Sequence, residues 1–142
     1  MKQVLVAFDG SESATRALQL AIDKAGDKGE RPIHLLITHP APIFYPEIGV
    51  TIAYETLMEA AARDAAKLLV PAEKLLENAG VGYTKEILCG PAAPLIAERA
   101  DPKRVSGIVM GTRGMGALKG LVLGSVANQV VHLAEVPVTL VK

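Results

Sequence analysis

The segment Val4-Leu5-Val6-Ala7-Phe8-Asp9-Gly10-Ser11 decides the fold class of this chain. It opens with an unbroken apolar run, which predicts a short strand buried on both faces of a sheet. An Asp-Gly-Ser turn follows, and beyond it the apolar residues of 14–25 recur at helical spacing. Either Ser11 or Ser13 is suited to cap that helix. A strand, a turn and a helix in this order form the first half of a βαβ unit.

The same alternation continues along the rest of the chain. The further strands that we predict are 33–38, 83–88, 105–110 and 136–141, and the helices between them are about 52–79, 95–100 and 126–134. Pro71 is expected to kink or divide the second helix. Charge in the third strand and Pro137 in the fifth place both at sheet edges. We therefore expect a single α/β domain, residues 1–142, with a doubly wound five-stranded parallel sheet of order 3-2-1-4-5 and helices on both faces.

Composition excludes several classes of protein. The chain has 142 residues, with 15 basic and 15 acidic side chains and one cysteine. Nucleic-acid binding is not expected, because it needs an excess of cationic side chains. A lone Cys89 cannot form an internal disulfide, which favours a reducing, cytoplasmic location. Membrane insertion is not expected either, since no apolar stretch approaches the roughly 18 residues that a spanning helix needs.

The predicted strand order places a topological switch point between the first and fourth strands. Ligands of such sheets bind beyond the carboxyl ends of the strands at that point. In this chain those ends carry the turn 9–11 and the turn Gly111-Thr112-Arg113-Gly114. Residues 40–50, which contain three prolines, form a long loop that is a candidate lid over the site.

Glycines in and after the second turn follow the spacing G-x2-G-x9-G-S, with Gly111, Gly114 and the pair Gly124-Ser125. Glycine lets a backbone approach a ligand closely and adopt positive φ. The N–H groups of Gly124, Ser125 and Val126 at the start of the last helix add a further anion site. Asp9 is suited to accept hydrogen bonds from ribose hydroxyls. Asp9 and Ser125 also fit a second interpretation as helix caps.

Four segments together resemble the universal stress protein family. They are Val4–Ser11, Gly107–Gly114, the stretch Leu-Val-Leu-Gly-Ser-Val-Ala-Asn-Gln-Val of 121–130, and Val136–Val141. The resemblance covers essentially the whole chain, and the glycine spacing is the one found in the ATP-binding members of that family. It implies a fold like that of the adenine nucleotide alpha hydrolases.

The resemblance also implies a ligand and a set of contacts. The ligand would be ATP, or AMP or ADP, with Mg²⁺ or Mn²⁺ held by the phosphates rather than by side chains. Asp9 and Gly111 would hold the ribose. The phosphates would lie against Gly114, Gly124, Ser125 and the N–H of Val126. A homodimer through the edge strand Val136–Val141 is expected, because such an edge offers unpaired backbone groups.

The sequence departs from the family pattern at two points near the expected site. Arg113 stands where the family often has histidine, and it would bring a permanent charge close to the phosphates. Ser106 replaces an aspartate that usually precedes the apolar run of the fourth strand. In addition, either Thr38 or His39 lies where the family places an apolar side chain against the base.

These features favour a nucleotide-binding regulatory or sensor protein of the stress response with little or no turnover. The sequence has no GxxxxGK[ST] motif and no second acidic residue two positions after Asp9. One alternative is a slow nucleotide hydrolase that uses the same site. The other is an interaction protein of the same fold that binds no nucleotide.

Overall fold

The computed structural model describes residues 1–26, 31–43, 53–114 and 123–142. Strands and helices alternate along these residues. They are β1 (Gln3–Ala7), α1 (Glu12–Ala25), β2 (Ile33–His39), α2 (Tyr54–Ala79), β3 (Tyr83–Cys89), α3 (Ala92–Arg99), β4 (Val105–Gly111), α4 (Ser125–Leu133) and β5 (Val138–Val141).

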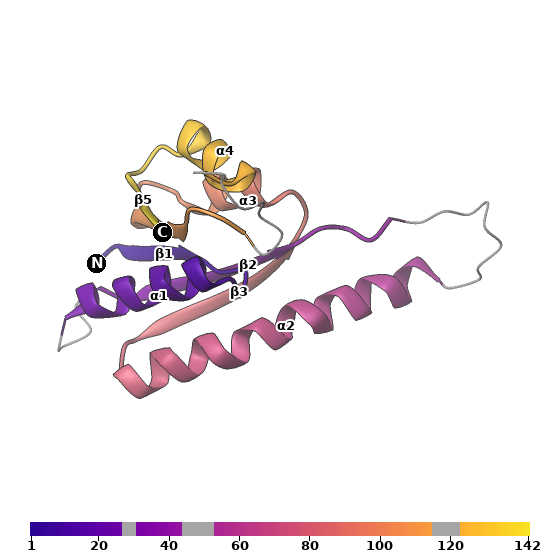
Figure 1. The fold of residues 1–142 in the computed structure, drawn as a ribbon, viewed down its shortest axis with the longest axis horizontal. Coiled ribbons are helices and arrows are strands. Elements are labelled where there is room, and N and C mark those ends of the chain that lie inside the picture. Colours follow the sequence, from indigo (N-terminus) through magenta and orange to yellow (C-terminus); the bar gives the residue numbers. More distant parts are fainter. Residues whose placement is uncertain (27–30, 44–52, 115–122) are drawn as a thin grey trace.

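All five strands pair in parallel in the order β3-β2-β1-β4-β5. α1 and α2 cover one face of the sheet, and α3 and α4 pack against the other (Figure 1). The predicted doubly wound fold and strand order are thus confirmed. Because α1 and α4 leave toward opposite faces, the switch point lies between the neighbouring strands β1 and β4.

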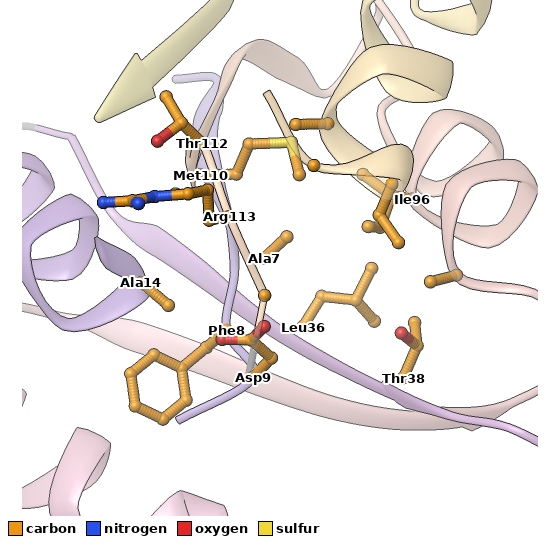
Figure 2. Close-up of a pocket in the computed structure, with 16 residues that line it drawn as sticks. Ala7, Phe8, Asp9, Ala14, Leu36, Thr38, Ile96, Met110, Thr112 and Arg113 are labelled. Carbon is orange, nitrogen blue, oxygen red and sulfur yellow. The ribbon is translucent and has the colours of Figure 1, made fainter. Parts of the chain in front are cut away.

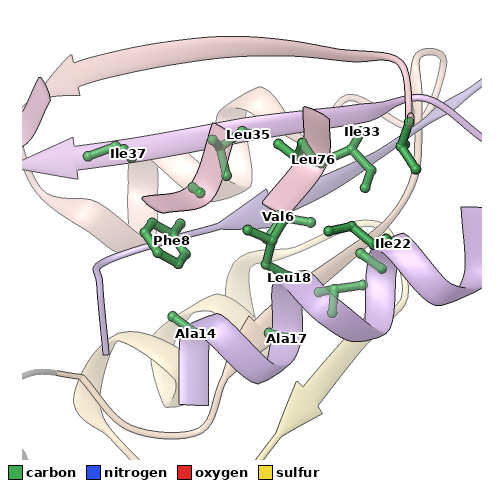
Figure 3. Close-up of a cluster of buried hydrophobic side chains, with 14 of the residues drawn as sticks. Val6, Phe8, Ala14, Ala17, Leu18, Ile22, Ile33, Leu35, Ile37 and Leu76 are labelled. Carbon is green, nitrogen blue, oxygen red and sulfur yellow. The ribbon is translucent and has the colours of Figure 1, made fainter. Parts of the chain in front are cut away.

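The first strand is buried on both faces, as its apolar run predicts. Val6 belongs to the core under α1 and α2, which Figure 3 shows with Leu18 and Ile33 around it. Leu5 belongs to the core under α3 and α4. Both side chains are 0 % exposed. Burying a side chain of this size contributes roughly 1.5–3 kcal/mol, so this central strand anchors both layers.

Pro71 does not divide the second helix. α2 runs from Tyr54 to Ala79 as one element with Pro71 inside it (Figure 1). The proline removes one hydrogen bond to the carbonyl of Lys67. Both residues are exposed, so water can satisfy that carbonyl, while Leu69 and Ala72 on either side stay buried in the core. Packing of the buried face therefore outweighs the loss of one bond on the outer face.

The fifth strand is shorter than predicted. It begins at Val138 rather than Val136, which is only 9 % exposed and packs in the core under α3 and α4. The carbonyl of Pro137 accepts a hydrogen bond from the N–H of Ile108 at 2.9 Å. The chain is thus already tied to β4 before the strand begins. Of the candidate lid 40–50, residues 44–50 lie outside the described part of the chain.

Candidate functional site

The turns that follow β1 and β4 lie next to each other, because these strands are neighbours in the sheet. Hydrogen bonds join the two turns directly. The buried hydroxyl of Ser13 donates to the carbonyl oxygen of Arg113 at 2.8 Å, and Ser11 Oγ lies 3.4 Å from the same oxygen. The first turn of α1 therefore fixes the path of the chain where it leaves β4.

Asp9 does not cap α1. Ser11 is the N-cap, and its Oγ accepts from the N–H of Ala14 at 3.1 Å. Asp9 Oδ1 instead accepts from the N–H of Ser11 at 2.9 Å, which fixes the carboxylate within the turn. Its other oxygen, Oδ2, faces Gly114 across the gap between the turns, 3.2 Å from where a Cβ on that glycine would lie.

The amino end of α4 differs in two ways from the expected arrangement. Gly124 is the N-cap and Ser125 is the first helical residue, and no side chain caps this end within the described residues. The interpretation of Ser125 as a cap is therefore wrong. The N–H of Gly124 is not free, because it donates to the carbonyl of Thr112. The N–H groups left for an anion are those of Ser125 and its successors in the first turn.

The signature glycines do not have positive φ. In the described part of the chain, positive φ occurs at Gly10, Gly26, Gly80 and Gly90, and not at Gly111, Gly114 or Gly124. A Cβ on Gly111 would collide with Ser13 and lie 2.8 Å from the N of Ala14. One on Gly124 would lie 3.1 Å from the carbonyl oxygen of Thr112. These glycines thus allow close approach of backbone segments, and the positive φ that glycine also permits does not occur at them.

A cavity of about 190 Å³ lies at this edge of the sheet (Figure 2). Most of the predicted site residues line it, namely Asp9, Thr38, Gly111, Arg113, Gly114, Gly124 and Val126. Ser125 and His39 do not. The rest of the lining was not predicted from the sequence. It consists of Thr112 and of the apolar residues Ala7, Phe8, Ala14, Leu36, Ala92, Ile96, Met110 and Ala127.

Thr38 and His39 point to opposite faces of β2, because neighbouring residues of a strand alternate. Thr38 shares its face with Leu36 and lines the cavity, as Figure 2 shows. His39 does not line the cavity; it faces α2 and lines a second groove, which Thr38 also borders, and its Nδ1 lies 3.3 Å from the carbonyl oxygen of Pro40. The structure therefore separates the two candidates, and Thr38 is the one beside the cavity.

Arg113 lines the rim of the cavity. Its side chain is exposed, and in Figure 2 the guanidinium extends away from the apolar part formed by Leu36 and Ile96. Asp9 is the one acidic side chain among the described lining residues. The described residues contain no group of three or more His, Cys, Asp or Glu side chains placed to hold a metal ion. Among them, no helix is long and apolar enough to cross a membrane.

Comparison with known proteins gives the family. The model of the universal stress protein family matches residues 1–142. The chain belongs to this family. It is 35 % identical over 148 residues to a universal stress protein of Thermus aquaticus, covering 99 % of this chain and 98 % of that protein.

Solved structures share the fold of this chain. The structure of the protein MJ0577 matches with a TM-score of 0.84 and 28 % identity, covering 99 % of this chain and 95 % of that one. A universal stress protein from Archaeoglobus fulgidus, solved in complex with dAMP, matches with a TM-score of 0.69 and 24 % identity over 100 % of this chain and 98 % of that one. Some proteins of this fold therefore hold adenine nucleotides.

Proposed function

We propose that this chain binds an adenine nucleotide in the cavity between the ends of β1 and β4. The observation that carries the proposal is the convergence of three features on one cavity: the Asp9 carboxylate, the turn Gly111–Gly114 and the amino end of α4. The dAMP complex of the Archaeoglobus fulgidus protein supports the choice of ligand. At 24 % identity that likeness shows only the fold, so the proposal depends on the residues of this chain.

The chemistry of the cavity changes from one side to the other. Leu36, Ile96 and Met110 form an apolar part in which a base can be buried, and Thr38 supplies a hydroxyl at its margin (Figure 2). Asp9 lies between this part and the glycine turn. Its Oδ2 accepts no hydrogen bond from the described residues, so it is available to ribose hydroxyls.

The phosphates would lie against the uncapped amino end of α4. Backbone N–H groups at a helix start bind anions without a lysine. Three charge-assisted hydrogen bonds at the upper end of the range of roughly 1.5–3 kcal/mol each would total about 9 kcal/mol, and a micromolar site needs roughly 8 kcal/mol after the cost of ordering the ligand. Mg²⁺ or Mn²⁺ would be held by the phosphates, since the lining offers a single carboxylate among the described residues.

A regulatory or sensor role follows better from this lining than rapid turnover does. The described lining residues include no histidine or lysine, and Asp9 is the one carboxylate among them. Oδ1 of that carboxylate already accepts from the N–H of Ser11. Because one oxygen of this possible general base is already hydrogen-bonded and no second catalytic side chain lies beside it among the described lining residues, we expect slow hydrolysis at most. Phosphate release at rates typical of ATPases would favour the alternative of a nucleotide hydrolase.

Titration calorimetry with ATP, ADP and AMP, with and without Mg²⁺, tests the binding. Asp9→Asn keeps an oxygen for the N–H of Ser11 but removes the charge, and we expect affinity to fall about tenfold. Asp101→Asn is the matched control, because Asp101 Oδ1 also accepts from a backbone N–H two residues on, that of Lys103, at 2.9 Å, but outside the cavity. No binding heat for any nucleotide, or equal losses in both variants, would overturn the proposal.

We also propose that β5 pairs with a second copy of the chain. β5 is an edge strand, and the N–H of Val138 faces away from β4, because the carbonyl of Pro137 in the same peptide faces toward it. Val138→Pro removes that outward donor and leaves the bonds to β4 in place. We expect a dimer of the wild type and a monomer of the variant by light scattering. A wild-type monomer, or a variant that stays dimeric, would exclude this interface.

A further inference from the structure

A second cavity lies at the opposite end of the sheet, beneath the carboxyl end of α1. Its volume is about 170 Å³, and residues of α1, β1, β4 and β5 line it. In Figure 1 the amino end of β1 and the carboxyl end of α1 lie together at the left of the molecule, far from the turns that form the nucleotide cavity. The two cavities have no lining residue in common.

An irregularity in the sheet and three small residues produce this cavity. Ala21 and Ala25 of α1 face Gly107 of β4, so little side-chain volume fills the space between helix and sheet. The pairing of β1 with β4 shifts from Gln3–Val105 to Val4–Gly107, which leaves Ser106 as an extra residue. Such bulges recur next to functional sites. The Ser106 hydroxyl donates to the carbonyl of Gln3 at 3.2 Å and holds the bulge in place.

The lining combines an apolar floor with a cationic rim. Val4, Val109 and the two alanines form the floor, while Lys24 and Arg31 are exposed at the rim. No aspartate or glutamate belongs to the described lining. The carboxyl end of a helix carries partial negative charge and disfavours anions. Among the described lining residues, two cationic side chains and no acidic one lie beside that partial negative charge, which favours an anion at the rim.

We propose that this cavity binds a small organic anion that carries one carboxylate on an apolar body about the size of a ring. An apolar cavity of about 150 Å³ holds benzene, so this cavity of about 170 Å³ has room for such a body. The planar guanidinium of Arg31 is suited to a bidentate contact with a carboxylate, and the ammonium of Lys24 adds a second charge.

Benzoate and benzamide form a matched pair of probes, because they share the ring and differ in charge. Titration of the ¹⁵N-labelled full chain with each compound, followed by amide chemical shifts, separates the two contributions. We expect saturable shifts at Gly107, Ala25 and Thr139 with benzoate, and affinity at least tenfold weaker for benzamide and for acetate. Equal binding of benzoate and benzamide would overturn the proposal, and so would acetate binding as tightly as benzoate or no saturation by any probe.

Variants test the assigned residues. Arg31→Gln and Lys24→Gln are exposed changes that preserve the fold, and each is expected to weaken benzoate binding about tenfold. Arg63→Gln on the exposed face of α2 is the matched control and should leave binding unchanged. Ala21→Leu fills the floor and should abolish binding in a chain whose circular dichroism is that of the wild type. Undiminished binding in both charge variants, or a loss in Arg63→Gln as large as in Arg31→Gln, would overturn the assignment.

Discussion

Gly10 in the turn after β1 and Gly111 at the end of β4 are both glycine, but for different physical reasons. Gly10 has φ +82°, a conformation that costs other residues energy. The nearest atom to a Cβ there is Leu68 Cδ2, the far end of a flexible side chain. Gly111 has no such φ, but a Cβ on it would collide with Ser13 and with the backbone of α1.

The difference shows what each turn does for the site. The turn after β1 changes the direction of the chain, so that Asp9 and the start of α1 lie at the edge of the cavity. The turn after β4 brings backbone segments together, with Thr112 accepting from Gly124 and Arg113 accepting from Ser13. Glycine is thus needed at Gly10 for its backbone conformation and at Gly111 because there is no room for a Cβ. Substitutions can test the two reasons separately.

The largest effect is expected for Gly111→Ala. The added methyl group must displace the first turn of α1, where the N of Ala14 would lie 2.8 Å away, and it breaks into the Ser13–Arg113 contact. Overpacking against backbone costs roughly 1–3 kcal/mol, and we expect the upper end of that range in the free energy of unfolding by urea.

Gly82→Ala is the matched control, because a Cβ at Gly82 meets nothing within 4 Å and the residue has no positive φ. We expect this variant to be as stable as the wild type or slightly more stable. A similar loss in both variants would mean that space at Gly111 is not the reason for glycine there.

Gly10→Ala should have a smaller effect. The positive φ costs about 1–2 kcal/mol, and rotation of Leu68 relieves most of the contact. Gly80→Ala measures the conformational part by itself, since Gly80 has φ +67° and open space around it. We expect the two variants to unfold at similar urea concentrations. A much larger loss of stability in Gly10→Ala than in Gly80→Ala would show that a Cβ is sterically excluded at Gly10 as well as at Gly111.

Gly124→Ala should act on ligand affinity more than on stability. Its Cβ would lie 3.1 Å from the carbonyl oxygen of Thr112 and 3.3 Å from Cα of Arg113, so the turn must move away from the start of α4 by a few tenths of an ångström. We expect about tenfold weaker ATP binding by calorimetry, about 1.4 kcal/mol. Gly82→Ala again serves as the control, and equal affinity in both variants would place the phosphates elsewhere.

Local patterns were enough to predict the fold. The apolar run of β1, the charged run of β3 and the alternation of strands with helices predict the strand order that the structure has. Thr38 could have been separated from His39 as well, because alternation along β2 places Thr38 on the face of the buried Leu36.

Contacts between segments that are distant in the sequence cannot be predicted from local sequence patterns. Ser13 and Arg113 are 100 residues apart, and nothing local indicates that one hydroxyl holds the other turn in place. The bond from Gly124 to Thr112 likewise forms only once α4 has docked beside β4. Pro71 shows the reverse case: a proline inside a helical pattern locally favours a break, but α2 packs on the sheet as one undivided helix.

The smallest effect is expected from removing a charge on the edge strand β3, that of Glu86, rather than from adding a methyl group to a glycine. The single N–H at Nε of Arg99 donates a bifurcated hydrogen bond to the two carboxylate oxygens of Glu86, at 3.1 and 3.0 Å. Burial alone would raise the pKa of Glu86, but the hydrogen bonds and charges of Arg99 and, to a lesser extent, His34 outweigh it and hold the pKa below its usual value of 4.5. A lowered folded-state pKa adds stability above the unfolded-state value, and this contribution is lost as the pH falls through the folded-state value.

Glu86→Gln should therefore lower the free energy of unfolding by about 1 kcal/mol or less at pH 7, and the difference from the wild type should shrink below pH 4.5. Glu98→Gln is the control, since Glu98 also contacts Arg99, at 3.6 Å, but is 69 % exposed, and it should change stability little. The loss of stability in Gly111→Ala is steric and should be the same at pH 7 and below pH 4.5. A pH-independent loss in Glu86→Gln would mean that packing around its side chain, and not its charge, stabilises the edge.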